Sequence, residues 1–463
     1  MPTAEQSPTL TRTELEASVA KLKATYASGR TRDLRWREVQ LRGLLRMLHT
    51  EEAAILDALR QDLGRDAIGA WMTDIATVQA EVEYALKHLR RWARPQRAKL
   101  PVTTWPSRGY LVPEPLGAVL VIGAWNYPFN LTLCPVVSAL AAGNAVAVKP
   151  SENAPASASL MARLLPAYLD SGAIAVFEGD GSVTSELLKI GFDHCLFTGS
   201  GAIARKVLAA AAESLTPVTL ELGGKSPVIV TADADVAVAA RRIAWAKVTN
   251  AGQTCITCDY ALVDRRVRAR FLEELSKALA EFTSDGMQRV VHRRHFDRLR
   301  ALGAGHGGSV VYGGSSDEST LTIEPLVVLD PDLDSPLMTD EIFGPILPVI
   351  TVDGLDDAIR FIADRPRPLA LYLFSERAKD LRKVVRRTSS GAVIHNHLML
   401  HAVAPQLPFG GVGASGSGNY HGRFGFGTFS HMKPVMRAFT KPDLDVLYPP
   451  YTPEKVKLIR RVL

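Results

Sequence analysis

The chain has 463 residues, of which 47% are hydrophobic and 22% are charged, and its net charge at pH 7 is +6. At roughly 150 residues per domain this length predicts two or three domains, and the composition excludes a largely disordered or fibrous protein. Four cysteines in so long a chain argue against a disulfide framework, and the small excess of positive charge is too diffuse to indicate nucleic-acid binding.

No segment has the pattern of a targeting signal or a membrane span. Residues 1–11 are polar and lack the apolar core of a signal peptide. The most continuous apolar runs, 119–122 and 136–142, are interrupted well before the roughly 18 residues that a span requires. Residues 456–463, which end the chain, are too few and too charged to cross a bilayer. We therefore expect a cytoplasmic protein without a membrane span.

The first hundred residues are predicted to be mainly helical. Thr11 and Glu14 have the spacing of a capping box, and Gly29 offers a stop for the helix that starts there. Amphipathic spacing predicts three further helices, over residues 36–48, 53–63 and 75–92.

A proline-rich segment follows, and its five prolines between residues 93 and 116 exclude a long helix. Two β-rich runs, 102–105 and 109–112, flank Pro106. This pattern predicts a hairpin or arm rather than part of a core.

From Gly117 onward, short apolar runs alternate with helical segments of 10–15 residues. This rhythm predicts a parallel sheet with helices on both faces, which places functional groups in the loops at the carboxyl ends of its strands. A second alternating block extends from residue 228 to about 394. We therefore expect an α/β fold with two doubly wound parallel sheets.

The densest basic stretch contains Arg293, Arg294, Arg298 and Arg300. Phe296 and Leu299 give it the apolar spacing of a helix. The segment is therefore predicted to be a solvated helix face rather than a site for a polyanion.

Cys255 lies in a small, polar, glycine-containing loop after a helix predicted over 236–248. Such a loop keeps a thiol accessible for nucleophilic chemistry, although two semi-buried cysteines, Cys255 and Cys258, would be the commoner reading of the pair. Cys134 and Cys195 are isolated, so the chain has no second CxxC motif and no metal site is predicted. Spacing alone favours Cys255 only slightly as a nucleophile.

Glu221 ends an apolar strand and is followed by two glycines. A carboxylate in that place can act as a general base if an apolar setting raises its pKa. An ion pair with Lys225 would explain the same residues equally well.

Asn126 follows a predicted buried strand and precedes a helix. Its amide could donate a hydrogen bond to a developing oxyanion. An asparagine that forms a turn or caps the helix is the commoner case.

Two further segments have features of a cofactor site. Lys149 and Glu152 follow the second strand of the first block, and Gly199 and Ser200 precede a helix whose first turn contains Ala204. Glycine allows close approach of a ligand to the backbone, and a helix N-terminus favours a pyrophosphate. The chain has no GxGxxG motif of the usual dinucleotide type, so these segments alone are weak signals.

Taken together and in this order, the segments resemble those of the aldehyde dehydrogenase superfamily over nearly the whole chain. Four segments are similar to the class 3 branch of fatty and aromatic aldehyde dehydrogenases. They are residues 367–374, residues 407–416, the Tyr-His-Gly that starts at Tyr420, and the ending 448–451.

The resemblance implies roles for the matching residues in NAD- or NADP-dependent oxidation of an aldehyde to an acid. Cys255 would attack the aldehyde and pass through a thiohemiacetal and a thioester, Asn126 would hold the oxyanion, and Glu221 would activate the hydrolytic water. The resemblance also implies cofactor-binding residues, which are Lys149, Glu152, Gly199, Ser200, Ala204, Glu341 and Phe343. The substrate would be a medium- or long-chain aliphatic or an aromatic aldehyde.

The resemblance implies three parts of the chain. Residues 1–99 and 117–222 would form a dinucleotide-binding domain and residues 223–395 a catalytic domain. Residues 100–116 and 396–463 would form a small β bridging element and tail that supports a homodimer. Two departures from the family pattern are Ala204, where a glycine is usual, and a shortened segment over 282–291.

Three alternatives remain at this point. A CoA-acylating dehydrogenase would have the same fold, but it would not need Glu221 to activate water. A cysteine hydrolase would pair Cys255 with a histidine, for which the candidates are His194, His395, His397 and His401. A binding protein that kept the fold without the activity is disfavoured by the joint presence of Cys255, Glu221 and Asn126.

Overall fold

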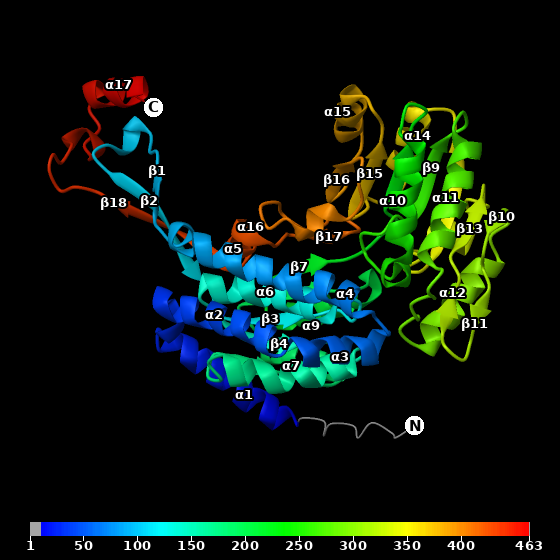
Figure 1. The fold of residues 1–463 in the computed structure, drawn as a ribbon. Coiled ribbons are helices and arrows are strands. Elements are labelled where there is room, and N and C mark those ends of the chain that lie inside the picture. The colour runs from blue at the N-terminus through cyan, green and yellow to red at the C-terminus, as the bar shows by residue number, and fades with distance from the viewer. Residues whose placement is uncertain (1–10, 463) are drawn as a thin grey trace.

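The computed structural model describes residues 11–462, so the prediction for the residues before Thr11 lies outside it. Figure 1 shows two helix-covered sheets side by side and an arm that carries the C-terminal helix away from them. The sheets have six strands, in the order β17-β7-β6-β3-β4-β5, and seven strands, in the order β10-β13-β14-β9-β8-β15-β16. The predicted α/β architecture with two mainly parallel sheets is confirmed.

The six-stranded sheet is parallel except at β17. Its strands are β3 (Ala118–Ile122), β4 (Ala145–Lys149), β5 (Ile174–Val176), β6 (His194–Thr198), β7 (Val218–Glu221) and β17 (Gly416–Ser417). Alternate residues of β3 face opposite sides: Val119 and Val121 join one hydrophobic cluster, whereas Leu120 joins another. This alternation explains why helices cover both faces.

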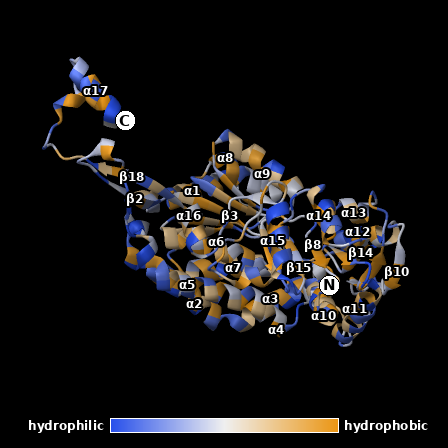
Figure 2. Cartoon of the chain, turned by 90° about the horizontal axis from the view of Figure 1, so that it is seen from above, coloured by the Kyte–Doolittle hydropathy of each residue, from blue (hydrophilic) through white to orange (hydrophobic). Residues whose placement is uncertain are grey.

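Two groups of helices cover this sheet, and Figure 2 shows them on its opposite sides. One group packs with α6 and comprises α2 (Leu34–Thr50), α3 (Glu52–Leu63), α5 (Ala76–Trp92), α6 (Pro128–Ala142) and α7 (Pro155–Tyr168). The other comprises α1 (Arg12–Ala27), α8 (Gly181–Ile190) and α9 (Gly201–Glu213). The predicted capping box of α1, from Thr11 and Glu14, is present.

Two short elements between α3 and α5 were not predicted. They are α4 (Ala67–Ala70) and the π-helical turn η2 (Trp71–Ile75), which runs directly into α5. A π turn widens the helix by one residue and often lies at a functional site. Here it carries the fully buried Asp74 toward α6.

The seven-stranded sheet is parallel except at its edge strand β10. Its strands are β8 (Pro227–Val230), β9 (Tyr260–Asp264), β10 (Ser309–Tyr312), β13 (Leu326–Leu329), β14 (Ile346–Val352), β15 (Ala370–Phe374) and β16 (Ala392–His395). Its helices are α10 (Val236–Val248), α11 (Arg268–Phe282), α12 (Arg293–Ala304), α13 (Pro336–Thr339), α14 (Leu355–Ala363) and α15 (Ala378–Arg387). A small ladder of β11 (Ser316–Asp317) and β12 (Thr322–Ile323) lies outside the sheet.

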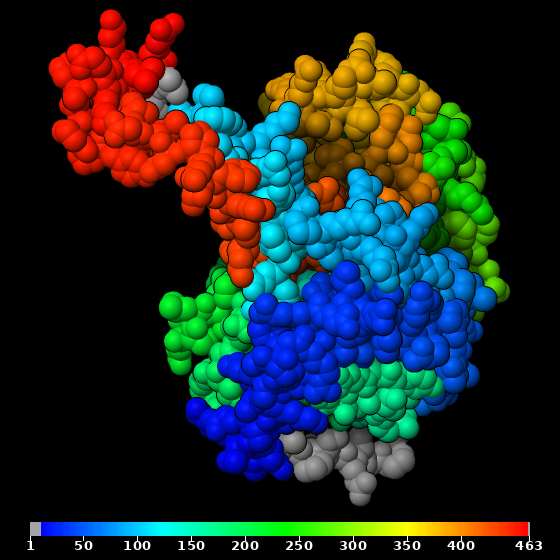
Figure 3. Space-filling view, turned by 90° about the vertical axis from the view of Figure 1, so that its left-hand side faces the viewer, coloured from blue at the N-terminus to red at the C-terminus, as the bar shows by residue number. Residues whose placement is uncertain are grey.

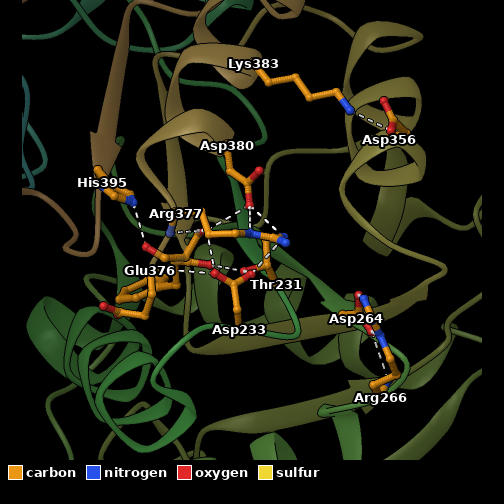
Figure 4. Close-up of polar contacts among 12 residues, drawn as sticks. Thr231, Asp233, Asp264, Arg266, Asp356, Glu376, Arg377, Asp380, Lys383 and His395 are labelled. Carbon is orange, nitrogen blue, oxygen red and sulfur yellow. Dashed lines mark hydrogen bonds and ion pairs between the residues drawn. The ribbon is translucent and has the colours of Figure 1, made fainter.

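Ion pairs join the loops that follow β8 and β15, where the strand order reverses (Figure 4). Arg377 Nη2 lies 3.0 Å from an Asp233 oxygen and 2.9 Å from an Asp380 oxygen. Ser375 Oγ donates to the same two carboxylates, at 3.2 and 3.0 Å. These side chains therefore pair with one another at the switch point of the second sheet.

The arm is a three-stranded antiparallel sheet of β1 (Gln96–Ala98), β2 (Arg108–Pro115) and β18 (Ser430–Arg437). The predicted hairpin exists, but its first strand is β1. The predicted strand at 102–105 is wrong: Val102–Thr104 forms a 3₁₀ turn, because the Thr104 N–H and hydroxyl both bond to the Pro101 carbonyl.

The C-terminal helix α17 (Pro453–Val462) has a proline as its first residue. Figure 3 shows the C-terminal segment projecting from the body beyond the arm. Within residues 11–462, no helix is long and apolar enough to cross a membrane.

Candidate active site

One cavity of about 710 Å³ lies where the carboxyl ends of β3, β6 and β7 face the second sheet. It collects nine of the ten predicted site residues, which are Cys255, Glu221, Asn126, Lys149, Glu152, Gly199, Ser200, Glu341 and Phe343. The tenth, Ala204, is buried in the first turn of α9 and does not line the cavity. The switch point of the six-stranded sheet, between β3 and β6, therefore opens into the same space as Cys255.

Cys255 lies in a tight loop between α10 and β9. Asn250 and Ala251, just before it, have left-handed backbone conformations (φ 53° and 52°), and the Thr257 N–H bonds to the Thr254 carbonyl. Burial raises the pKa of the Cys255 thiol to about 12, and the carboxylates of Glu341 and Glu221 add to this effect. The thiol is therefore protonated at neutral pH in this state of the protein.

Glu221 ends β7 and is 2% exposed. Neither of its carboxylate oxygens has a hydrogen-bond partner among the described residues, and burial raises its pKa well above the ordinary value. Lys225 does not pair with it: its ammonium group donates to Asp259 and to the carbonyls of Leu337 and Asp340. The ion-pair alternative for Glu221 is therefore wrong, and the group keeps its capacity for proton transfer.

Asn126 ties the β3 loop to the Cys255 loop. Its Nδ2 donates to the Gln253 carbonyl (3.1 Å), and Asn250 Nδ2 donates back to the Asn126 carbonyl (2.9 Å). The N-cap of α6 is Tyr127, so Asn126 does not cap the helix. One amide hydrogen of Asn126 stays free to face an oxygen in the cavity.

The far end of the cavity has the features of a dinucleotide site. Lys149 is 1% exposed, and its ammonium group lies 3.5 Å from Glu152 and donates to the Pro150 carbonyl (2.8 Å). Gly199 and Ser200 precede α9, whose N-terminal N–H groups suit a pyrophosphate. Lys149 and Glu152 could hydrogen-bond the hydroxyls of a ribose whose phosphates lie at the start of α9.

The segment 341–343 closes the opposite end of the cavity. Glu341 is partly buried, and its pKa is raised to about 7 by desolvation and by the nearby charge of Asp259. Phe343 has a left-handed backbone (φ 54°), and its ring meets the edge of Trp125 at 5.4 Å.

Two side chains of α12 hold this segment, so the predicted solvated helix face is confirmed for Arg293, Arg294 and Arg300 but is wrong for Arg298. Arg298 donates to the carbonyls of Glu341 (3.1 Å) and Ile342, and His295 Nε2 lies 2.9 Å from the Phe343 carbonyl. Both residues line the cavity, whereas the other three arginines of the stretch are exposed. Sequence spacing missed them because their partners lie over 40 positions away along the chain.

The cavity also contains residues that carried no signal in the sequence. They include Trp125, Ser151, Thr184, Ser185 and Lys206. Lys206 lies on α9, two residues after Ala204, so helical spacing from Gly199 and Ser200 was the one signal that could have found it.

None of the four histidines considered for a hydrolase lines the cavity. His194 bonds to Thr219 Oγ1 (3.1 Å), and His395 lies 2.8 Å from the Ser375 carbonyl. His295 does line the cavity, but the Phe343 carbonyl occupies its Nε2 and burial lowers its pKa to about 4. A cysteine–histidine pair is therefore not formed by the described residues.

Comparison with known proteins gives one consistent result. A family model described as the aldehyde dehydrogenase family matches residues 3–435. The mouse protein "Aldehyde dehydrogenase family 3 member A2" is 44% identical over 450 residues, which cover 96% of this chain and 93% of that protein. The dog protein "Aldehyde dehydrogenase, dimeric NADP-preferring" is 43% identical and covers 93% of this chain and 97% of its own length.

Solved structures agree with these relatives. A substrate-bound state of Staphylococcus aureus AldH is 40% identical to this chain, with a TM-score of 0.93, and covers 96% of this chain and 99% of that one. A Mycobacterium tuberculosis aldehyde dehydrogenase complexed with NAD+ is 26% identical, with a TM-score of 0.85 over 93% of this chain and 91% of that one.

Proposed function

The chain belongs to the aldehyde dehydrogenase family, and from this membership we propose how its cavity carries out the reaction. The protein is an enzyme that oxidises an aldehyde to the carboxylic acid with NAD or NADP. Relatives that are 42–44% identical to it are members of family 3. What remains to be assigned is the work of each residue.

Cys255 is the proposed nucleophile. The thiol first loses its proton to solvent, and the thiolate sulfur then forms a C–S bond to the aldehyde carbon while the carbonyl π electrons move onto oxygen. The free amide hydrogen of Asn126 and the Cys255 N–H hold that oxyanion. The cofactor, when bound, accepts a hydride from this carbon.

Glu221 is the proposed base for the second half of the reaction. Its unpartnered carboxylate takes a proton from a water molecule, the hydroxide adds to the thioester carbon, and the C–S bond breaks to release the acid. A base with this task is unnecessary if CoA is the acceptor. This argues against the acylating alternative, which stays testable.

The cofactor assignments rest on the lining of the cavity. We propose that Lys149 and Glu152 bind the adenosine ribose, that Gly199 and Ser200 face the pyrophosphate, and that Glu341 and Phe343 position the nicotinamide end. Ala204 would act only through α9, since it is buried. The proposed substrates are medium- or long-chain aliphatic and aromatic aldehydes.

The proposed division of the chain keeps residues 1–99 and 117–222 as the dinucleotide-binding domain and 223–395 as the catalytic domain. Residues 100–116 and 396–463 form the bridging element and tail. Exposed apolar side chains on β18, Val435 and Met436, support pairing with a second subunit in a homodimer. A cytoplasmic location is part of the same proposal, and cell fractionation would test it.

The observation that carries the proposal is the meeting of Cys255, Glu221 and Asn126 in one cavity with a helix N-terminus at the β3–β6 switch point. The test follows reduced cofactor at 340 nm with a panel of aldehydes and either NAD or NADP, with and without CoA. We expect CoA-independent turnover that Cys255→Ser abolishes. Turnover that required CoA, or full activity of Cys255→Ser, would contradict the assignments.

A further inference from the structure

A buried ion pair lies behind the loop that carries Asn126. Arg65, just after α3, has a side chain that is 3% exposed, and it pairs with the fully buried Asp74. The guanidinium also donates to Thr73 and lies 4.7 Å from the centre of the Tyr127 ring. Arg65 itself does not line the cavity that contains Cys255.

Asp74 fixes the start of α6. Its Oδ1 accepts the N–H groups of Phe129 (3.0 Å) and Asn130 (3.1 Å), while its other oxygen faces Arg65. The Thr73 carbonyl accepts the Asn130 side-chain amide (2.8 Å). The π-helical turn thus holds the helix that begins immediately after the loop of Asn126.

Tyr127 links this anchor to the nucleophile loop. One face of its ring meets Arg65, and its hydroxyl forms a 2.7 Å hydrogen bond with Thr254 Oγ1. Thr254 is the residue before Cys255, and Tyr127 is the residue after Asn126. A shift of the Tyr127 ring therefore moves both the amide donor and the thiol.

We propose that Arg65 is a positioning residue for the oxidation step, and this inference rests on the proposed function of Cys255 and Asn126. Arg65 contacts Asp74 on one side and the Tyr127 ring on the other. These contacts keep the oxyanion donor Asn126 and the nucleophile Cys255 at a fixed separation. A displacement of about 1 Å between such groups costs on the order of 100-fold in rate. The effect should appear in the chemical step and not in cofactor affinity, because Arg65 does not line the cavity that contains the proposed cofactor-binding residues.

The test compares Arg65→Lys and Arg65→Met with Arg37→Met in rapid-mixing measurements of the burst of reduced cofactor. Arg37 is the matched control because it is also buried and holds the opposite end of α6, where it donates to the Ala141 carbonyl (3.2 Å). Melting temperature and the NADH dissociation constant are measured on each protein.

We expect Arg65→Lys to slow the burst about tenfold and Arg65→Met about 100-fold, with NADH affinity unchanged within twofold. Arg37→Met should lose thermal stability but keep a burst rate within twofold of wild type. A folded Arg65 variant with the wild-type burst rate would overturn the inference, as would an equal slowing in Arg37→Met.

A second measurement keeps the inference testable if Arg65→Met does not fold. Tyr127→Phe and Thr254→Val each remove the 2.7 Å hydrogen bond between these two side chains. The double variant should therefore slow the burst no more than either single variant does. Additive slowing would overturn the proposed path. Absence of any burst in the wild-type protein would instead overturn the proposed function on which the inference depends.

Discussion

The Glu341 carboxyl group packs directly against the Cα of Gly223, so that a Cβ atom at residue 223 would lie 2.6 Å from Glu341 Cδ. Gly223 is two residues after Glu221 and belongs to the link between the two sheets. The absence of a side chain there is what lets Glu341 reach across to the first sheet. A single glycine thereby sets the place of the proposed nicotinamide-ribose ligand.

Replacing this glycine should weaken cofactor binding without unfolding the protein. In Gly223→Ala the new methyl group displaces the flexible end of Glu341, and we expect the NADH dissociation constant, measured by fluorescence titration, to rise about tenfold, the loss of roughly one hydrogen bond to a charged group. Gly427→Ala is the control, because nothing lies within 4 Å of a Cβ at that position. Unchanged NADH affinity in Gly223→Ala would show that Glu341 does not contribute to cofactor binding.

Glu221→Gln should separate the two halves of the reaction. The amide cannot take a proton from water, so reduced cofactor should appear in a burst close to one equivalent per site, followed by turnover about 100-fold slower than wild type. The exposed carboxylate of Glu213 at the end of α9 provides the control Glu213→Gln. If burst and steady state fell together, Glu221 would not be the deacylation base.

The raised pKa of Cys255 predicts the pH dependence of its alkylation in the free enzyme. With a pKa of about 12, the thiolate fraction grows tenfold per pH unit below that value, so inactivation by iodoacetamide should accelerate tenfold from pH 7 to 8 and again to pH 9. Glu341 is the strongest charged contributor to this shift. Glu341→Gln should therefore lower the pKa and speed alkylation about three- to tenfold at pH 8. A rate that levels off near pH 8 in the wild type would contradict the high pKa.

The carboxyl group of Glu81, which does not line the cavity, should make the stability of the protein depend on pH. Burial raises its pKa in the folded protein to about 7, although its Oε1 accepts the Gly422 N–H. The folded state favours the protonated form of Glu81, so ionising this group lowers the free energy of unfolding. This loss is absent below about pH 4.5 and develops as the pH rises through 7. Glu81→Gln should therefore stabilise the protein by about 2 kcal/mol at pH 8 and by little at pH 5. Equal urea midpoints for the two proteins at pH 8 would contradict this.

Local patterns predicted much of the fold. The capping box at Thr11, the α10 helix and the alternation of strands and helices depend on neighbours within a few residues, and the structure has all of them. The first strand of the arm was misplaced because residues 102–105 are β-prone in composition but satisfy their backbone in a local turn after Pro101. The π turn was missed because its cause, Asp74 under α6, is a contact over 50 positions away.

The candidate site was predicted only in part, again because some of its contacts join residues that are far apart in the chain. The sequence and its resemblance named nine residues that line one cavity. Whether Glu221 paired with Lys225 depended on Asp259, the residue just before β9, whose carboxylate is the partner of that lysine. Arg298 was assigned to solvent with the rest of its basic stretch because helical spacing does not reveal which face a distant loop covers. Residue types and local spacing thus indicate chemistry, whereas partner choice requires the folded chain.

The reacting groups are divided between the two halves of the molecule: Glu221 and Asn126 extend from the six-stranded sheet, and Cys255 from the loop that leads into the seven-stranded one. The reaction therefore requires the two halves to stay aligned to within about an ångström. Mild denaturant should consequently abolish activity before circular dichroism detects unfolding. Activity would then report how well the two halves are aligned.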